Sequence, residues 1–168
     1  MLESNLPRLL YIGDVPVEST VAGSALIYRL LQKYPAKKLY IVEGNTSVSQ
    51  VEKRLAEIKY NVLEVGNQRL INSRLNRWYS SYLYLTTKNK TSQLKEVIKT
   101  FKPEAILTVA HGFSWLAAAE IARKHRLDLH LIVHDDLVSY LPIFSQLKAH
   151  KNVTKKYKMA VNSLLARF

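Results

Sequence analysis

The sequence contains no cysteine, few glycines and prolines, and fewer acidic than basic residues. The absence of cysteine excludes disulfide bonds, thiol catalysis and thiolate metal ligands, and is compatible with the cytoplasm. No apolar run approaches the roughly 18 residues that a membrane-spanning helix requires. The amino-terminal residues lack the basic start, apolar middle and small-residue cleavage site of a secretory signal. We therefore expect residues 1–168 to form one domain in the cytoplasm.

The shortage of acidic residues gives the chain a strong positive charge. Twenty-five Lys and Arg residues stand against 13 Asp and Glu residues, for a net charge of +12. Such a balance favours an anionic partner, which is a membrane surface, a nucleic acid or a phosphorylated ligand. A basic surface that only interacts with solvent is the alternative.

Short apolar runs alternate with helical patterns along most of the chain. Two strands joined by a helical crossover must be parallel, and the crossover is right-handed in nearly all proteins. The pattern therefore predicts an α/β fold with a doubly wound, mainly parallel sheet and helices on both faces. We expect strands at 6–12, 38–42, 61–65, 105–110 and 129–133, helices at 21–34, 48–59, 91–101, 113–126 and 137–150, and a closing amphipathic helix at 152–168.

Polar residues follow two successive strands of this predicted sheet. His111 and Gly112 follow the first of them, and His134, Asp135 and Asp136 follow the second. Ligands of parallel sheets gather at the carboxyl ends of the strands. The second group has the chemistry to orient sugar hydroxyls, to transfer protons or to hold a metal, although adjacent carboxylates in an extended chain point in different directions. For each histidine, a hydrogen bond within a loop is the alternative.

The loop between the first strand and the first helix ends near Gly23 and Ser24. A glycine at the start of a helix lets an anionic ligand approach free backbone N–H groups. The spacing matches neither the dinucleotide-binding pattern nor the P-loop, so it does not support either of those functions. A glycine required for packing explains Gly23 equally well.

A further segment combines aromatic and basic residues. It contains Arg74, Arg77, Trp78, Tyr79 and Tyr82. Packing of the aromatic rings on the sheet, contact with a membrane interface and stacking on nucleic-acid bases all remain open. Helices on both faces of a parallel sheet leave few strands for base stacking, which argues against nucleic acid.

Three segments together resemble the N-terminal domain of retaining glycosyltransferases of the GT-B fold, the family of glycogen-synthase-like and mannosyltransferase enzymes. They are LLYIGDVPVESTVAGSALIYRLL, PEAILTVAHGFSWLAAAEIARKH and LHLIVHDD. The resemblance implies a Rossmann-like domain that binds the acceptor. It implies His134 and Asp135 as catalytic residues at the transferred sugar. It also implies a substrate-binding role for Gly23 and Ser24, near the donor diphosphate, and for His111, Gly112 and Asp136.

The resemblance covers only half of such an enzyme. The second domain of the family binds the nucleotide sugar and supplies a pair of glutamates, and we find no counterpart in this sequence. We therefore expect no transferase activity from the chain alone, no metal and no resident cofactor, and a nucleotide sugar only in a complete two-domain enzyme. We further expect a missing domain or partner subunit, or self-association through exposed apolar surface. We also expect a lipid-linked or anionic acceptor and a peripheral location at the inner face of the membrane.

Two other functions remain open at this point. The chain is alternatively a stand-alone, flavodoxin-like interaction module with a basic surface that docks on a membrane or a partner. A small hydrolase using His111, His134 and Asp135 is the third possibility, but the sequence contains no nucleophile elbow of the GxSxG type.

Overall fold

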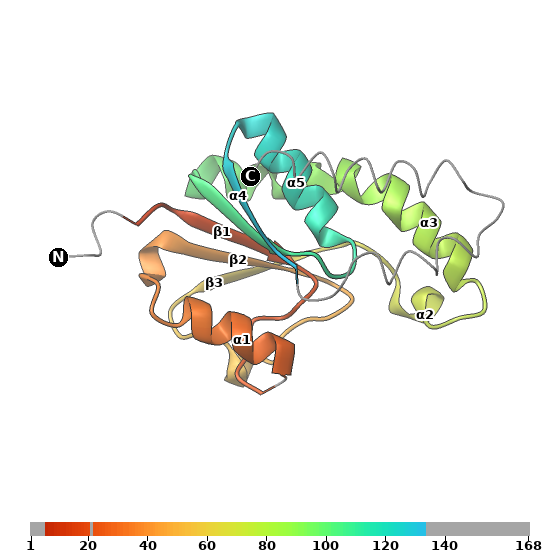
Figure 1. Cartoon of the computed structure of the whole chain (residues 1–168), viewed down its shortest axis with the longest axis horizontal. Coiled ribbons are helices and arrows are strands. Elements are labelled where there is room, and N and C mark those ends of the chain that lie inside the picture. Colours follow the sequence, from red (N-terminus) through yellow and green to blue (C-terminus); the bar gives the residue numbers. More distant parts are fainter. Residues whose placement is uncertain (1–5, 21, 134–168) are drawn as a thin grey trace. The chain divides into compact units, whose positions relative to one another are not determined.

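The computed structural model describes residues 6–20 and 22–133, apart from the side chains of Gln68 and Arg77. The helices expected at 137–150 and 152–168 lie outside these residues, as do His134, Asp135 and Asp136. The elements follow one another as β1 (Leu9–Gly13), α1 (Ala22–Leu31), η2 (Ala36–Lys38), β2 (Leu39–Gly44), η3 (Val51–Lys53), β3 (Lys59–Leu63), α2 (Gln68–Ile71), α3 (Asn76–Thr86), η4 (Thr87–Leu94), α4 (Lys95–Phe101), β4 (Ala105–Val109), α5 (Ser114–His125) and β5 (Asp128–Ile132) (Figure 1).

The described strands form one five-stranded sheet in the order β3-β2-β1-β4-β5. Every neighbouring pair is parallel, with Leu9 of β1 opposite Leu39 of β2 and opposite Ala105 of β4. The predicted α/β class and the parallel, doubly wound sheet are therefore confirmed. The central strand β1 is buried along its whole length, as expected for a strand covered on both faces.

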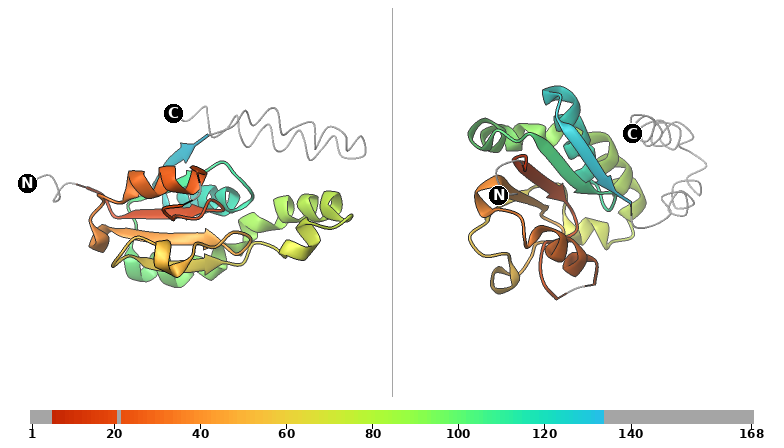
Figure 2. Two further views of the ribbon diagram at one scale, coloured as in Figure 1. Left: turned by 90° about the horizontal axis from the view of Figure 1, so that it is seen from below. Right: turned by 60° about the vertical axis from the view of Figure 1, so that its left-hand side comes forward.

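The period-two alternation of β1 divides the core into two layers. Leu9 and Tyr11 pack in one cluster with Ile27 and Leu31 of α1. Neighbouring strand residues point to the opposite face, where α4 and α5 cover the sheet (Figure 2). The helices on the two faces thus enclose the sheet from both sides, as the sequence predicts.

The helices α4 and α5 each end at a residue in the left-handed conformation. Lys102 after α4 has φ 51°, and Arg126 after α5 has φ 54°. The backbone N–H of each of these residues donates to a carbonyl in the last turn of its helix, on Ile98 and Ala122 respectively. This is a common way to end a helix, and Pro103 prevents α4 from continuing.

The predicted helix at 48–59 is wrong. Only a short 3₁₀ turn, η3, forms there, and Glu57 adopts φ 63°. The backbone N–H groups of Ser49 and Gln50 donate to the carboxylates of Glu43 and Glu18, which are distant in sequence. These contacts hold the start of the segment to two carboxylates outside it, and the left-handed conformation of Glu57 is incompatible with a continuous helix, so the segment folds as a loop.

Candidate functional site

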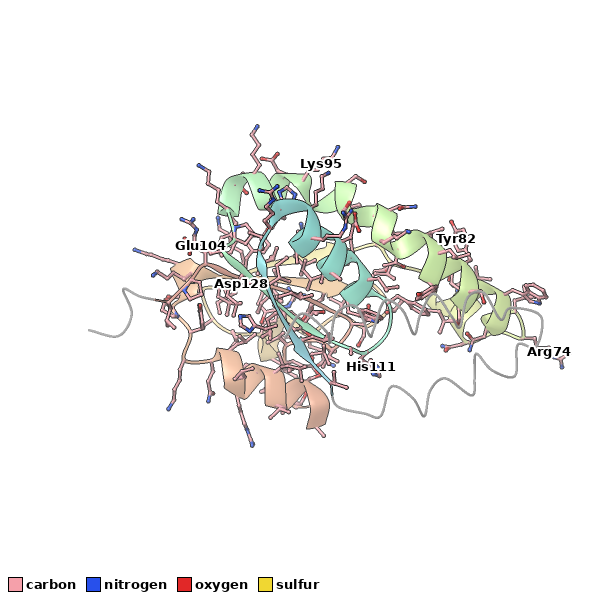
Figure 3. The ribbon with its side chains drawn as sticks, turned by 45° about the horizontal axis from the view of Figure 1, so that its top comes forward. Arg74, Tyr82, Lys95, Glu104, His111 and Asp128 are labelled. Carbon is pink, nitrogen blue, oxygen red and sulfur yellow. The ribbon has the colours of Figure 1, made fainter. Side chains whose placement is uncertain are left out.

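The sheet changes its winding direction between β1 and β4. The chain leaves β1 for α1 on one face, and it leaves β4 for α5 on the other face (Figure 2). Ligands of open parallel sheets bind at the carboxyl ends of the strands at such a switch point. The two loops that start there, residues 13–20 and 110–113, therefore define the candidate site. Figure 3 shows His111 at this end of β4 and Glu104 at the opposite end.

A buried carboxylate joins the two loops. Asp14 accepts hydrogen bonds from the backbone N–H groups of Phe113 at 2.6 Å and Ser114 at 2.7 Å, and from the Ser114 hydroxyl at 2.7 Å. Ser114 is the first residue of α5, so Asp14 binds the free N–H groups at the amino terminus of that helix. The loop after β1 thereby fixes the start of the helix after β4.

Burial and hydrogen bonding act on Asp14 in opposite directions. Burial raises the pKa of the Asp14 carboxyl above its ordinary value, and this effect exceeds the lowering by the hydrogen bonds from Ser114 and Phe113. With its oxygens bound to three donors, Asp14 acts as a connector between two loops rather than as a group directed at a ligand.

Two glycines make room for the Asp14 side chain. A Cβ atom on Gly44, at the end of β2, would overlap the Asp14 carboxylate, and so would a Cβ atom on Gly112. Gly112 also has φ +64°, a conformation that side chains rarely adopt. The backbone at the ends of β1, β2 and β4 therefore lies close to the Asp14 carboxylate.

Two further buried carboxylates hold the neighbouring loops. Glu43 accepts hydrogen bonds from Val17 N–H at 2.8 Å, Ser49 N–H at 3.0 Å and Ser49 Oγ at 2.8 Å. Its partner Arg54 lies 3.9 Å away. Glu18 accepts hydrogen bonds from the Gln50 N–H and from the Thr20 hydroxyl. Among the described residues no group of three or more His, Asp or Glu side chains is arranged to hold a metal ion.

The predicted substrate-side residues have different environments. Gly23 lies exposed in the first turn of α1, and a Cβ atom there would meet nothing within 4 Å. Ser24 is buried. His111 and Gly112 are exposed at the carboxyl edge of β4. The structure thus brings His111 and Gly112 next to the loop that follows β1, and the predicted positions 134–136 lie outside the described residues.

The predicted membrane-contact residues divide between the two sides of α3. Trp78 and Tyr82 are exposed, as is Arg74 just before the helix. Tyr79 is half-buried, and its hydroxyl accepts a hydrogen bond from the Asn67 N–H at 2.6 Å. The Arg77 side chain is outside what the structure describes. Part of this aromatic segment therefore packs inward and part faces outward. Within residues 6–20 and 22–133, no helix is long and apolar enough to cross a bilayer.

Sequence reasoning missed the three buried carboxylates. Asp14 and Glu43 each stand at or directly after the end of a strand, where an acidic residue is able to bind the N–H groups of loops and helix starts. That position is the available signal. Their partners Ser114, Val17 and Ser49 are not adjacent in sequence, so the pairing itself is visible only in the fold.

Comparison of the chain with protein-family models, with curated proteins and with solved structures finds no match. The assignment to the α/β class therefore rests on the sheet order and the parallel pairing of the chain itself.

Proposed function

We propose that the chain is the acceptor-binding, Rossmann-like domain of a retaining glycosyltransferase of the GT-B fold. One observation carries this proposal. Two of the resembling segments, residues 9–31 and 103–125, lie on the two sides of the switch point and are joined by Asp14 and Ser114. The sequence resemblance and the edge where parallel sheets bind ligands thus coincide.

Three of the described residues, Gly23, His111 and Gly112, are exposed and thus accessible for the roles that the resemblance implies. Gly23 is exposed at the first turn of α1 with open space around it, which suits a backbone approach by the donor diphosphate. Ser24 is buried as a whole residue, so in this structure it offers a ligand neither its side chain nor its backbone. His111 and Gly112 line the acceptor side, and His134, Asp135 and Asp136 keep the roles that the resemblance gives them.

In this proposal the donor site belongs to a second domain or to a partner subunit. Leu26 and Leu30 on the outer side of α1 are exposed, and apolar side chains near one another on a surface suit a covering partner. Catalysis needs donor and acceptor positioned together, so the chain alone is inactive. The acceptor is lipid-linked or anionic, and the location is peripheral at the inner face of a membrane, in keeping with the charge of +12.

A stand-alone, flavodoxin-like interaction module is the second candidate. Among the described residues every buried polar side-chain atom has a hydrogen-bond partner, which is compatible with a domain that folds by itself. Its basic surface would then dock on a membrane or a partner.

Binding of sugars by the isolated chain distinguishes these functions. The chain is applied to an array of glycans and glycolipids, and is titrated by calorimetry with UDP-, GDP- and ADP-sugars. We expect saturable binding of an acceptor sugar and no saturation by a nucleotide sugar at micromolar concentrations. His111→Ala should weaken acceptor binding about tenfold, because a hydrogen bond to the ligand is lost.

His125→Ala is the matched control, because His125 is exposed at the far end of α5. Micromolar binding of a nucleotide sugar by this chain would contradict the proposed division between two domains. A folded chain that binds no sugar would favour the stand-alone module.

A further inference from the structure

The outer side of α3 carries a continuous row of exposed apolar side chains. The exposed fractions are 58% for Leu75, 64% for Trp78, 56% for Tyr82 and 46% for Leu85. These residues are separated by three, four and three positions, which places them on one face of the helix. We refer to these four residues as the α3 stripe.

The opposite side of α3 anchors the helix to the domain. Leu83 is fully buried, and Tyr84 is 8% exposed. The Tyr79 hydroxyl accepts a hydrogen bond from the Asn67 backbone, in the segment before α2. The buried side chains of α3 thus lie on the side of the helix that faces the domain, whereas the residues of the α3 stripe are largely exposed.

The chain segment that contains the stripe carries charge of only one sign, and the acidic group that interacts with it from another element is Glu120 of α5, next to Lys88. Between Glu64 and Glu96 the sequence contains no Asp or Glu. Lys90 donates to the carbonyls of Glu64 and Val65 and so serves the fold. Arg69, Arg74, Lys88 and Lys95 are exposed. Figure 3 shows Arg74 and Tyr82 pointing away from the ribbon in this region.

The positive charge around the α3 stripe distinguishes between its possible binding partners. A second copy of the chain, with net charge +12, would bring like charges together. The segment 137–168 of the same chain also contains no acidic residue, so it is disfavoured for the same reason. The partner must be anionic.

The side-chain types favour a lipid surface over a nucleic acid. Tyr82 stacks on Tyr79, with ring centroids 6.0 Å apart, so one face of its ring is already covered. Leucines stand at both ends of the stripe and offer no ring for a base to stack on. Leucine together with amphipathic Trp and Tyr, bordered by Arg and Lys, is the composition that lies in the interface of an anionic bilayer.

We propose that the α3 stripe, bordered by Arg69, Arg74 and Lys88, docks the chain on an anionic lipid surface. α3 extends beyond the carboxyl ends of the strands in both views of the domain (Figures 1 and 2). Docking through this helix would hold the candidate site at the side of the domain that meets the lipid. The inference rests on the membrane location given in the proposed function and names its surface, but its test does not depend on sugar binding.

Tryptophan fluorescence of the full chain tests the proposal directly. Trp115 is 2% exposed and Trp78 is largely exposed, so a change on adding vesicles reports on Trp78. Vesicles of phosphatidylcholine with phosphatidylglycerol should shift the emission to shorter wavelength, and lipids brominated near the headgroup should quench it. Pure phosphatidylcholine should give a much weaker effect, and added salt should release the chain.

Vesicle co-sedimentation of matched variants separates the stripe from general charge attraction. The double variant Trp78→Ala/Tyr82→Ala should lose about tenfold or more in affinity, because two interfacial anchors are removed. Val48→Ala/Val51→Ala removes two exposed apolar side chains from the segment after β2, 43% and 71% exposed, and should leave the affinity unchanged. Arg74→Glu should weaken binding more than Lys33→Glu, which alters an exposed residue just after α1.

Three outcomes would overturn the proposal. The first is vesicle binding that the Trp78→Ala/Tyr82→Ala variant retains in full. The second is an emission change with a single-stranded oligonucleotide or a polyglutamate peptide but not with anionic vesicles. The third is a concentration-dependent dimer, seen by sedimentation, that the same double variant abolishes.

Discussion

Asp14 at the end of β1 accepts two hydrogen bonds from Ser114, which lies 100 positions further along the chain. The backbone N–H and the hydroxyl of Ser114 each lie 2.7 Å from a carboxylate oxygen. This contact joins the two loops at the switch point of the sheet. It places His111 and Gly112 in a turn between a buried strand and an anchored helix.

Replacing Asp14 should therefore destabilise the whole domain. Asp14→Ala leaves the N–H groups of Phe113 and Ser114 without their acceptor, at a cost of about 3 kcal/mol or more. Urea unfolding measures the loss. Glu120→Ala, which removes the surface pair with Arg123, should cost less than about 1 kcal/mol and serves as the control. Equal losses in the two variants would contradict the connecting role of Asp14.

Three glycines should respond differently to alanine. Gly112→Ala combines the strain of φ +64° with overlap of Asp14, and should cost about 2 kcal/mol or more. Gly44→Ala should also be destabilising, because its Cβ would meet the same carboxylate. Gly23→Ala should be neutral or stabilising by up to about 1 kcal/mol, since it lies in a helix with open space around it. Thermal unfolding of the three variants checks this order.

Glu43 should control the loop that follows β2. Glu43→Gln weakens the hydrogen bonds from Val17 and Ser49, so the amide hydrogens of these residues should exchange about tenfold faster or more. Glu52→Gln, a change at an exposed residue in η3, should leave the exchange rates as they are. Unchanged protection in the Glu43 variant would mean that other contacts hold this loop.

Ionisation of Tyr60 should lower the free energy of unfolding at high pH. Burial raises the pKa of Tyr60 to about 12, from an ordinary value of 10.0. The folded state therefore holds this proton more tightly than the unfolded state, and the stabilisation is complete below pH 10.0 and lost as the pH rises through about 12. The difference in unfolding free energy between the wild type and Tyr60→Phe should follow this course. A difference that does not change over this range would contradict it.

The strand-and-helix pattern was predictable because each element carries its own periodic signal. Leu39–Gly44 and Ala105–Val109 are short apolar runs, and α5 has helical spacing. The strand expected at 61–65 forms at Lys59–Leu63, because the exposed edge strand has a weaker apolar pattern. The loop at 46–58 was not predictable, since Glu18 and Glu43 determine it from other parts of the chain.

The place of His111 and Gly112 on the sheet was predictable, but the contacts around them were not. Polar residues after β4 indicate the carboxyl edge, and the structure places His111 there. The role of Asp14 depends on β1 and β4 being neighbours, which no local pattern specifies. The composition of α3 indicates an aromatic surface, but only the fold separates the buried Tyr84 from the exposed Tyr82.

Backbone NMR of the isolated chain, titrated with an acceptor sugar selected on the glycan array, tests whether the carboxyl edge of the sheet binds an acceptor. We expect the chemical-shift changes to gather on residues 110–113, with His111 and Gly112 foremost, and on the first turn of α1 at Gly23. We expect no saturable change with UDP-, GDP- or ADP-sugars. Changes confined to other parts of the sheet, or saturation by a nucleotide sugar at micromolar concentration, would contradict the assignment of this edge to an acceptor.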